Sequence, residues 1–145
     1  MEKVSNLIVQ HGKRIDRIVK AMLLHGATKD TELSEVDIKD FITRNVNLSY
    51  HAMRAIEPIE VDLNLNLLAL GKVKVFSQDL GRAFINVLDN SFDSMKAKLN
   101  QSTDDFYVPS LNIETEMDGV DLVIRVKDNG IGINVEEKSK IFEPF

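Results

Sequence analysis

The stretch Asn86-Val87-Leu88-Asp89-Asn90-Ser91-Phe92-Asp93 combines an apolar helix pattern with a polar stripe. Asn86, Asn90 and Asp93 recur at positions i, i+4 and i+7, so they project from one narrow face of a helix. Asparagine and aspartate are poor helix formers, and a face that only meets water would more cheaply use Glu, Lys or Gln. Amide and carboxylate groups suit a site for Mg²⁺ and phosphate, because they offer hard oxygens and N–H donors. A solvated helix face is the simpler alternative.

A second motif, Asp128-Asn129-Gly130-Ile131-Gly132, follows directly on the apolar stretch of residues 122–126. Glycines permit positive φ and let the backbone approach a ligand closely. An aspartate at the end of a strand can accept a hydrogen bond from an amine such as that of adenine. An ordinary Asp-Asn-Gly turn is the alternative interpretation. The motif is not a P-loop, because no Lys-Ser/Thr follows the glycines.

The remaining chain predicts helices on one side of an antiparallel or mixed sheet, which is an α+β two-layer sandwich. Helical periodicity covers residues 4–25, 37–54 and 77–99. We expect Asp37 and Ser77 to be the N-caps of the second and third helices. Strand patterns cover residues 59–65, 111–117 and 120–126, with Asp118-Gly119 as a two-residue turn between the last two. Residues 27–36 and 100–109 are polar and predict a linker and a loop.

Composition excludes several classes of function. The 145 residues suffice for one domain with a sizeable core, and 43% hydrophobic residues is ordinary for a globular protein. A net charge of −5 provides no basic field for nucleic acid. The absence of cysteine excludes disulfides, thiolate zinc sites and cysteine nucleophiles. No apolar run approaches the roughly 18 residues of a membrane span, and no signal peptide is visible. We therefore expect a soluble, cytoplasmic protein.

In chain order, three motifs resemble those of the ATP-binding catalytic domain of sensor histidine kinases. This domain has the Bergerat fold, which is shared with gyrase B, Hsp90 and MutL. Residues 86–93 resemble its N box, residues 128–133 its first glycine box, and residues 140–145 its F box. The resemblance covers roughly residues 37–145. It implies a two-component signalling kinase that binds Mg²⁺ and ATP for phosphoryl transfer to a protein histidine.

The resemblance also implies individual roles in a nucleotide site. The implied nucleotide-binding residues are Asn86, Asn90, Asp93, Asp128, Gly130, Gly132 and Phe142. Asn90 would hold the Mg²⁺ ion, and Asn86 would assist in the same phosphate region. Asp128 would bind the adenine amino group, the two glycines would admit the base, and Asp93 would lie near the adenine and ribose. Phe142 belongs to the F box, which opens the lid over ATP in the family.

The residue at position 86 discriminates within the superfamily. Gyrase-like ATPases carry a glutamate at this position as general base for water, whereas an asparagine cannot take a proton. Asn86 therefore favours phosphoryl transfer to a protein side chain over ATP hydrolysis. Two alternatives remain: a gyrase- or Hsp90-like ATPase domain, and a non-catalytic dimerisation or regulatory module derived from a histidine kinase.

The N-terminal residues 1–26 resemble the second helix of the dimerisation and phosphotransfer hairpin of these kinases. The resemblance implies a homodimer and, in the intact protein, a response regulator as partner. The phosphoacceptor histidine of the family lies in the first helix of the hairpin and is followed by an acidic residue. His11, His25 and His51 lack that context, so we expect no phosphoacceptor among them.

The quoted sequence ends at Phe145, within the motif that resembles the F box. In the family, the ATP lid, the second glycine box and the last strands come after this point. We therefore expect the 145 residues by themselves to bind ATP weakly and not to autophosphorylate, because several phosphate-binding N–H groups would be missing.

Overall fold

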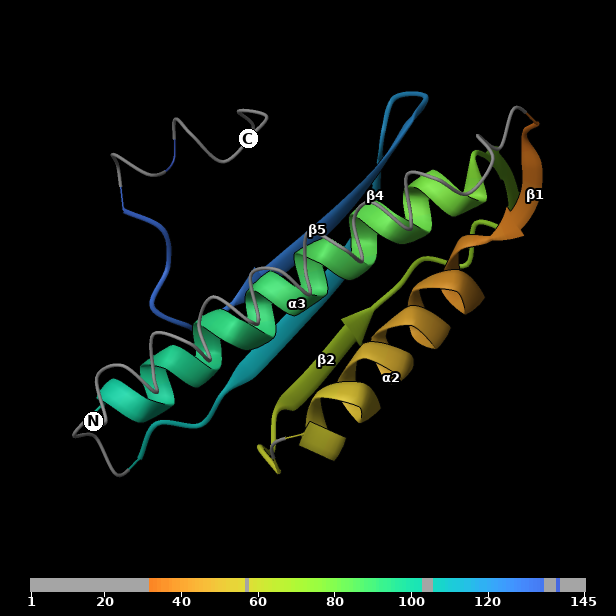
Figure 1. Ribbon diagram of the computed structural model, residues 1–145. Helices are drawn as coiled ribbons and strands as arrows, with labels where there is room; N and C mark the ends of the chain where they lie inside the picture. The colour runs from red at the N-terminus through yellow and green to blue at the C-terminus, as the bar shows by residue number, and fades with distance from the viewer. Residues whose placement is uncertain (1–31, 57, 103–105, 135–137, 139–145) are drawn as a thin grey trace.

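The computed structural model describes residues 32–56, 58–102, 106–134 and 138. The helix expected over residues 4–25 lies outside these ranges. Five strands and two helices follow one another along the described chain (Figure 1). They are β1 (Ser34–Asp37), α2 (Ile38–Ile56), β2 (Asp62–Asn66), β3 (Lys72–Val75), α3 (Ser77–Gln101), β4 (Ser110–Asp118) and β5 (Asp121–Asp128).

The larger sheet has the strand order β2-β4-β5, with β2 parallel to β4 and β5 antiparallel to β4. The smaller sheet is the antiparallel pair of β1 and β3. Helices α2 and α3 pack on each other, and α3 contacts β5, so that the two helices form one layer over the larger sheet (Figure 1). The α+β two-layer sandwich predicted from the sequence is thus confirmed.

The core lies between the helix layer and the larger sheet. Residues spaced by three and four along α2 and α3 meet residues spaced by two along β4, as expected for one buried face of each element. The buried hydrophobic residues are Ile38, Ile42, Val46, Phe84, Leu88, Phe92, Met95, Leu111 and Ile113. This core orients α3, because its buried face determines which residues point away from the sheet.

The two predicted helix caps have different outcomes. Asp37 caps α2 as predicted, since its Oδ1 accepts a hydrogen bond from the backbone N of Asp40 at 3.0 Å. The prediction for Ser77 is wrong, because Ser77 is already the first helical residue of α3. Phe76 occupies the N-cap position without a side-chain cap, and its carbonyl accepts the first helical bond from Leu80 N at 2.9 Å.

Residues 34–36, expected to belong to a polar linker, instead form most of strand β1. Their partner is β3, which the sequence patterns did not predict. The register places Glu35 opposite Lys74 and Asp37 opposite Lys72, so the charged side chains lie on one face of the pair. These strands have only four residues each. Their charged residues lie opposite residues of the other sign only once the two segments have paired.

The boundaries of the other strands differ slightly from the predictions. β2 begins at Asp62 rather than at residue 59. The backbone N of Asp62 donates a hydrogen bond to Pro109 O at 2.9 Å. The hairpin turn lies one residue further along than expected, at Gly119 and Val120, because Asp118 pairs with Asp121. Gly119 has φ +61°, as a type II′ turn requires at its first central position.

Within the described ranges, neither helix combines the length and the apolar character needed to cross a membrane.

Candidate functional site

The loop that follows β5 docks on one side of α3. We call residues 129–132 the glycine loop, and Asn86, Asn90, Ser94 and Lys98 the polar ridge, because these four occupy successive i, i+4 positions of α3. Ile131 N donates to Ser94 O at 3.3 Å, and Gly132 N donates to Ser94 Oγ at 3.4 Å. Lys98 Nζ donates to Asn129 O at 2.8 Å. The glycine loop therefore contacts the last two residues of the polar ridge, Ser94 and Lys98.

The predicted site residues on α3 lie beside this docked loop. Asn90 is one helical turn from Ser94, and Asn86 is one turn further away. Asn86, Asn90 and Asp93 are all exposed, on a side of α3 away from its buried residues. The amide groups therefore lie on the same ridge that receives the glycine loop. We predicted that these three residues line a single cavity with Asp128, and this stays a prediction.

Gly130 makes the closest approach between the glycine loop and α3. A Cβ atom at this position would lie 2.2 Å from Ser94 Oγ, 2.5 Å from Ser94 C and 2.7 Å from Met95 N. Any side chain at position 130 would overlap the backbone of α3, so this position requires glycine. Gly132 differs, because it has φ +73° and nothing within 4 Å of the position of a Cβ atom. The predicted role of both glycines, to admit a base, stays a prediction.

Asp128 is the last residue of β5 and is half-buried. Its Oδ1 accepts a hydrogen bond from Gly130 N at 2.9 Å, which turns the chain sharply at the start of the loop. The carboxylate is therefore held at the junction between the sheet edge and the glycine loop. This placement agrees with a site at the end of the strand.

Asn129 joins the glycine loop to the start of β4 and to the segment just before it. Its Oδ1 accepts a hydrogen bond from Ser110 N at 2.9 Å, and its Nδ2 donates to Val108 O at 2.8 Å. The Tyr107 hydroxyl lies 3.1 Å from the same Oδ1. Burial raises the pKa of Tyr107, and the negative charge of Asp128 raises it further.

Four residues of this arrangement were missed by the sequence predictions: Ser94, Lys98, Tyr107 and Asn129. Ser94 and Lys98 continue the i+4 spacing that begins at Asn86, so the spacing itself was a usable signal. Tyr107 and Asn129 are 22 residues apart, and no local pattern connects them. Phe142, the remaining predicted site residue, lies outside the described residues.

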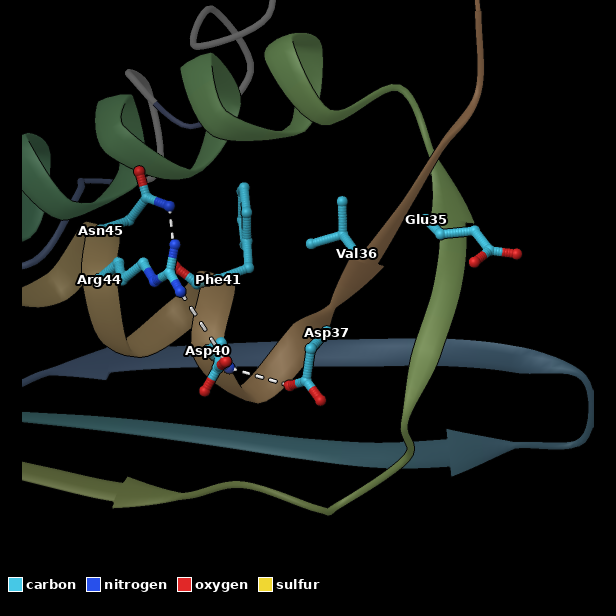
Figure 2. Close-up of a pocket in the computed structure, with 7 residues that line it drawn as sticks. All are labelled: Glu35, Val36, Asp37, Asp40, Phe41, Arg44 and Asn45. Atoms are coloured by element: carbon cyan, nitrogen blue, oxygen red, sulfur yellow. Dashed lines mark hydrogen bonds and ion pairs between the residues drawn. The ribbon is translucent and has the colours of Figure 1, made fainter.

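Two cavities of the described structure lie elsewhere. One, of about 320 Å³, is lined by residues of β1 and the first turns of α2 (Figure 2). Its polar groups serve the start of α2, since Asp37 caps the helix and Asp40 pairs with Arg44 at 4.0 Å (Figure 2). The other, of about 420 Å³, is lined by Asn112, Glu114, Arg125 and Lys127 of β4 and β5.

Acidic and histidine side chains do not gather into a metal-binding cluster in the part of the chain that the structure describes.

Comparisons with known proteins give two findings. Residues 76–145 match the family model described as histidine kinase-, DNA gyrase B- and HSP90-like ATPase. Among solved structures, the catalytic domain of histidine kinase ThkA, in a nucleotide-free form, matches with a TM-score of 0.62 and 19% identity, over 79% of this chain and 70% of that one. No curated protein matches significantly. Over residues 76–145, the family model agrees with the motifs at the level of this broad ATPase group, and the likeness to ThkA confirms the fold.

Proposed function

We propose that this chain is the ATP-binding part of a sensor histidine kinase. The premise is that residues 76–145 match the family of histidine kinase-, DNA gyrase B- and HSP90-like ATPases. In the intact protein of a two-component system, it would bind Mg²⁺ and ATP for phosphoryl transfer to a protein histidine, and a response regulator would be its partner. ATP is available in the cytoplasm, and a sequence without cysteine suits a reducing compartment. We therefore place the protein in the cytoplasm.

The observation that carries this proposal is the polar ridge beside the docked glycine loop. Two exposed amides, of Asn86 and Asn90, precede the two ridge residues that hold the loop. Amide oxygens can coordinate Mg²⁺, and amide N–H groups can donate to phosphate. A ligand that spans the ridge and the loop would therefore meet metal-coordinating groups at one end and the Asp128 carboxylate at the other.

The residues present fit Mg²⁺ and ATP. The surroundings of Gly132 are open, so a ligand can reach the backbone of the loop. Asn90 would hold the ion, Asn86 would bind the phosphates, and Asp128 would accept a hydrogen bond from an exocyclic amine. When bound, ATP supplies the phosphoryl group that is transferred. Asn86 cannot act as a general base toward water, which favours a protein acceptor over hydrolysis.

Calorimetry of the intact protein with ATP, with and without Mg²⁺, tests the proposal. Asn90→Ala should weaken Mg²⁺–ATP binding by about 10- to 100-fold, because one interaction with a charged group is lost. The matched control is Asn47→Ala, since Asn47 is an exposed asparagine of α2, away from the ridge. Equal affinities of parent and Asn90→Ala, or equal losses for both variants, would contradict the site assignment.

A further inference from the structure

Three side chains tie the glycine loop to two other parts of the fold. We propose that Lys98, Tyr107 and Asn129 are positioning residues, which hold Asp128 and the glycine loop in the geometry that receives the nucleobase without touching the nucleotide themselves. We call these three residues the loop clamp. The inference rests on the proposed function and adds to it the residues on which the geometry of the site depends.

Asn129 is the centre of the loop clamp. Its side chain bonds to Ser110 and Val108, and its backbone N donates to Ser110 O at 3.2 Å. Both the amide oxygen and the amide nitrogen of the side chain are thus used within the protein. Because these partners are the first residue of β4 and a residue just before it, Asn129 fixes the glycine loop relative to the sheet.

Lys98 provides the second connection, from α3. Its ammonium group donates to Asn129 O at 2.8 Å and lies 4.7 Å from the centre of the Tyr107 ring. A half-buried ammonium that has both a carbonyl and an aromatic face is held by charge-assisted and cation–π interactions. Lys98 therefore joins helix, loop and the segment before β4 at one point. Its bond to the loop spans 31 residues of sequence.

The loop clamp acts on Asp128 through the chain itself. Asn129 is the next residue, and the Asp128 carboxylate is bonded to Gly130 on the other side of it. At the far end of the loop, Ser94 holds Ile131 and Gly132. The loop is thus fixed at both ends, and loss of the Lys98 contact removes the link between α3 and the end that carries the carboxylate.

A positioning role and a direct phosphate contact predict different results for Lys98→Met. If the ammonium only positions the loop, affinity for ATP, ADP and adenosine should fall by the same factor, because all three share the base. If the ammonium instead binds phosphate, ATP should lose much more affinity than adenosine. Equal losses of about tenfold, which correspond to one charge-assisted hydrogen bond, are the expected result.

The experiment measures the three affinities by calorimetry for the intact parent protein and for its variants Lys98→Met, Lys98→Arg and Tyr107→Phe. Lys39→Met, at an exposed lysine position early in α2, is the matched control and should bind like the parent. Lys98→Arg keeps a cation that can donate to Asn129 O and interact with the Tyr107 ring, so it should recover part of the affinity. Hydrogen exchange at the Asn129 and Gly130 amides, without nucleotide, should be faster in Lys98→Met than in Lys39→Met.

Several outcomes would overturn the inference. They are a selective loss for ATP, unchanged affinities in Lys98→Met despite faster exchange, and unchanged exchange despite weaker binding. The milder Tyr107→Phe variant keeps the test informative if Lys98→Met fails to fold. Failure of the proposed function has a different signature, because then the parent itself would bind none of the three nucleotides and nucleosides.

Discussion

At the scale of single residues, Gly130 marks the tightest contact between the candidate site and the core. We predict that Gly130→Ala displaces the glycine loop, because the new Cβ would overlap backbone atoms of Ser94 and Met95. Overpacking of this kind costs about 1–3 kcal/mol. Urea unfolding measures the loss of stability, and the amide NMR signals of Asp128 and Gly132 report the displacement.

Gly71→Ala separates steric overlap from backbone strain. Gly71 has φ +70° but nothing within 4 Å of a Cβ position, so its substitution should cost only about 1 kcal/mol and leave the glycine loop in place. Gly130 has an ordinary φ, so its effect should be steric alone. A shift of the loop signals in Gly71→Ala but not in Gly130→Ala would refute this assignment.

Tyr107 gives the site a predicted response to alkaline pH. Its pKa is raised above the ordinary value of 10.0, chiefly by burial and then by Asp128. As pH rises past that value, the unfolded chain releases the phenol proton while the folded chain keeps it, so the free energy of unfolding falls. Tyr107→Phe should therefore lose less stability than the parent between about pH 9 and about pH 11. If urea unfolding shows the same loss of stability in Tyr107→Phe and in the parent, the phenol of Tyr107 does not contribute to the pH dependence.

At the scale of elements, α3 has two functions on two faces. Its buried face, with Phe84, Leu88, Phe92 and Met95, packs in the core, while the polar ridge faces the glycine loop. Because one rigid helix carries both, the core determines where the ridge lies. The site is therefore built on a packed element, with the loop added to it.

The register of β1 and β3 places opposite charges across from each other on the two strands. We predict that Lys74→Glu destabilises the protein by about 0.2–1 kcal/mol, because it places two carboxylates opposite each other at positions 35 and 74. The double variant Glu35→Lys/Lys74→Glu restores opposite charges and should recover the loss. A double-mutant cycle in urea measures the coupling, and additive effects would show that the pair does not interact.

At the scale of the whole molecule, we propose a homodimer formed through residues 1–26, which lie outside the described residues. The sequence has an apolar stripe at Val4, Leu7, Ile15, Ile18 and Met22, and one amphipathic helix cannot bury such a stripe alone. Ile15→Lys should shift the particle to a monomer in sedimentation at high concentration. Asp16→Lys, beside the stripe, should not. A monomeric parent protein would disprove the proposal.

The sequence by itself determined the features that depend on local spacing. The i, i+4 and i+7 pattern placed Asn86, Asn90 and Asp93 on one exposed face of α3, and the alternating patterns predicted the β4–β5 hairpin to within a residue or two. The Asp37 cap was also predictable. These features follow from the geometry of a single helix or hairpin, so nearby residues carry the information.

Only the tertiary structure decided which distant segments meet. Residues 34–36 of β1 were predicted to be linker and β3 was not predicted, because the two strands stabilise each other across about 40 residues of chain. Lys98 and Tyr107 meet Asn129 across 31 and 22 residues, and Gly130 is required because α3 passes directly beside it. Such contacts depend on how the core packs α3 against the sheet, and that packing arises from the whole chain rather than from any short pattern.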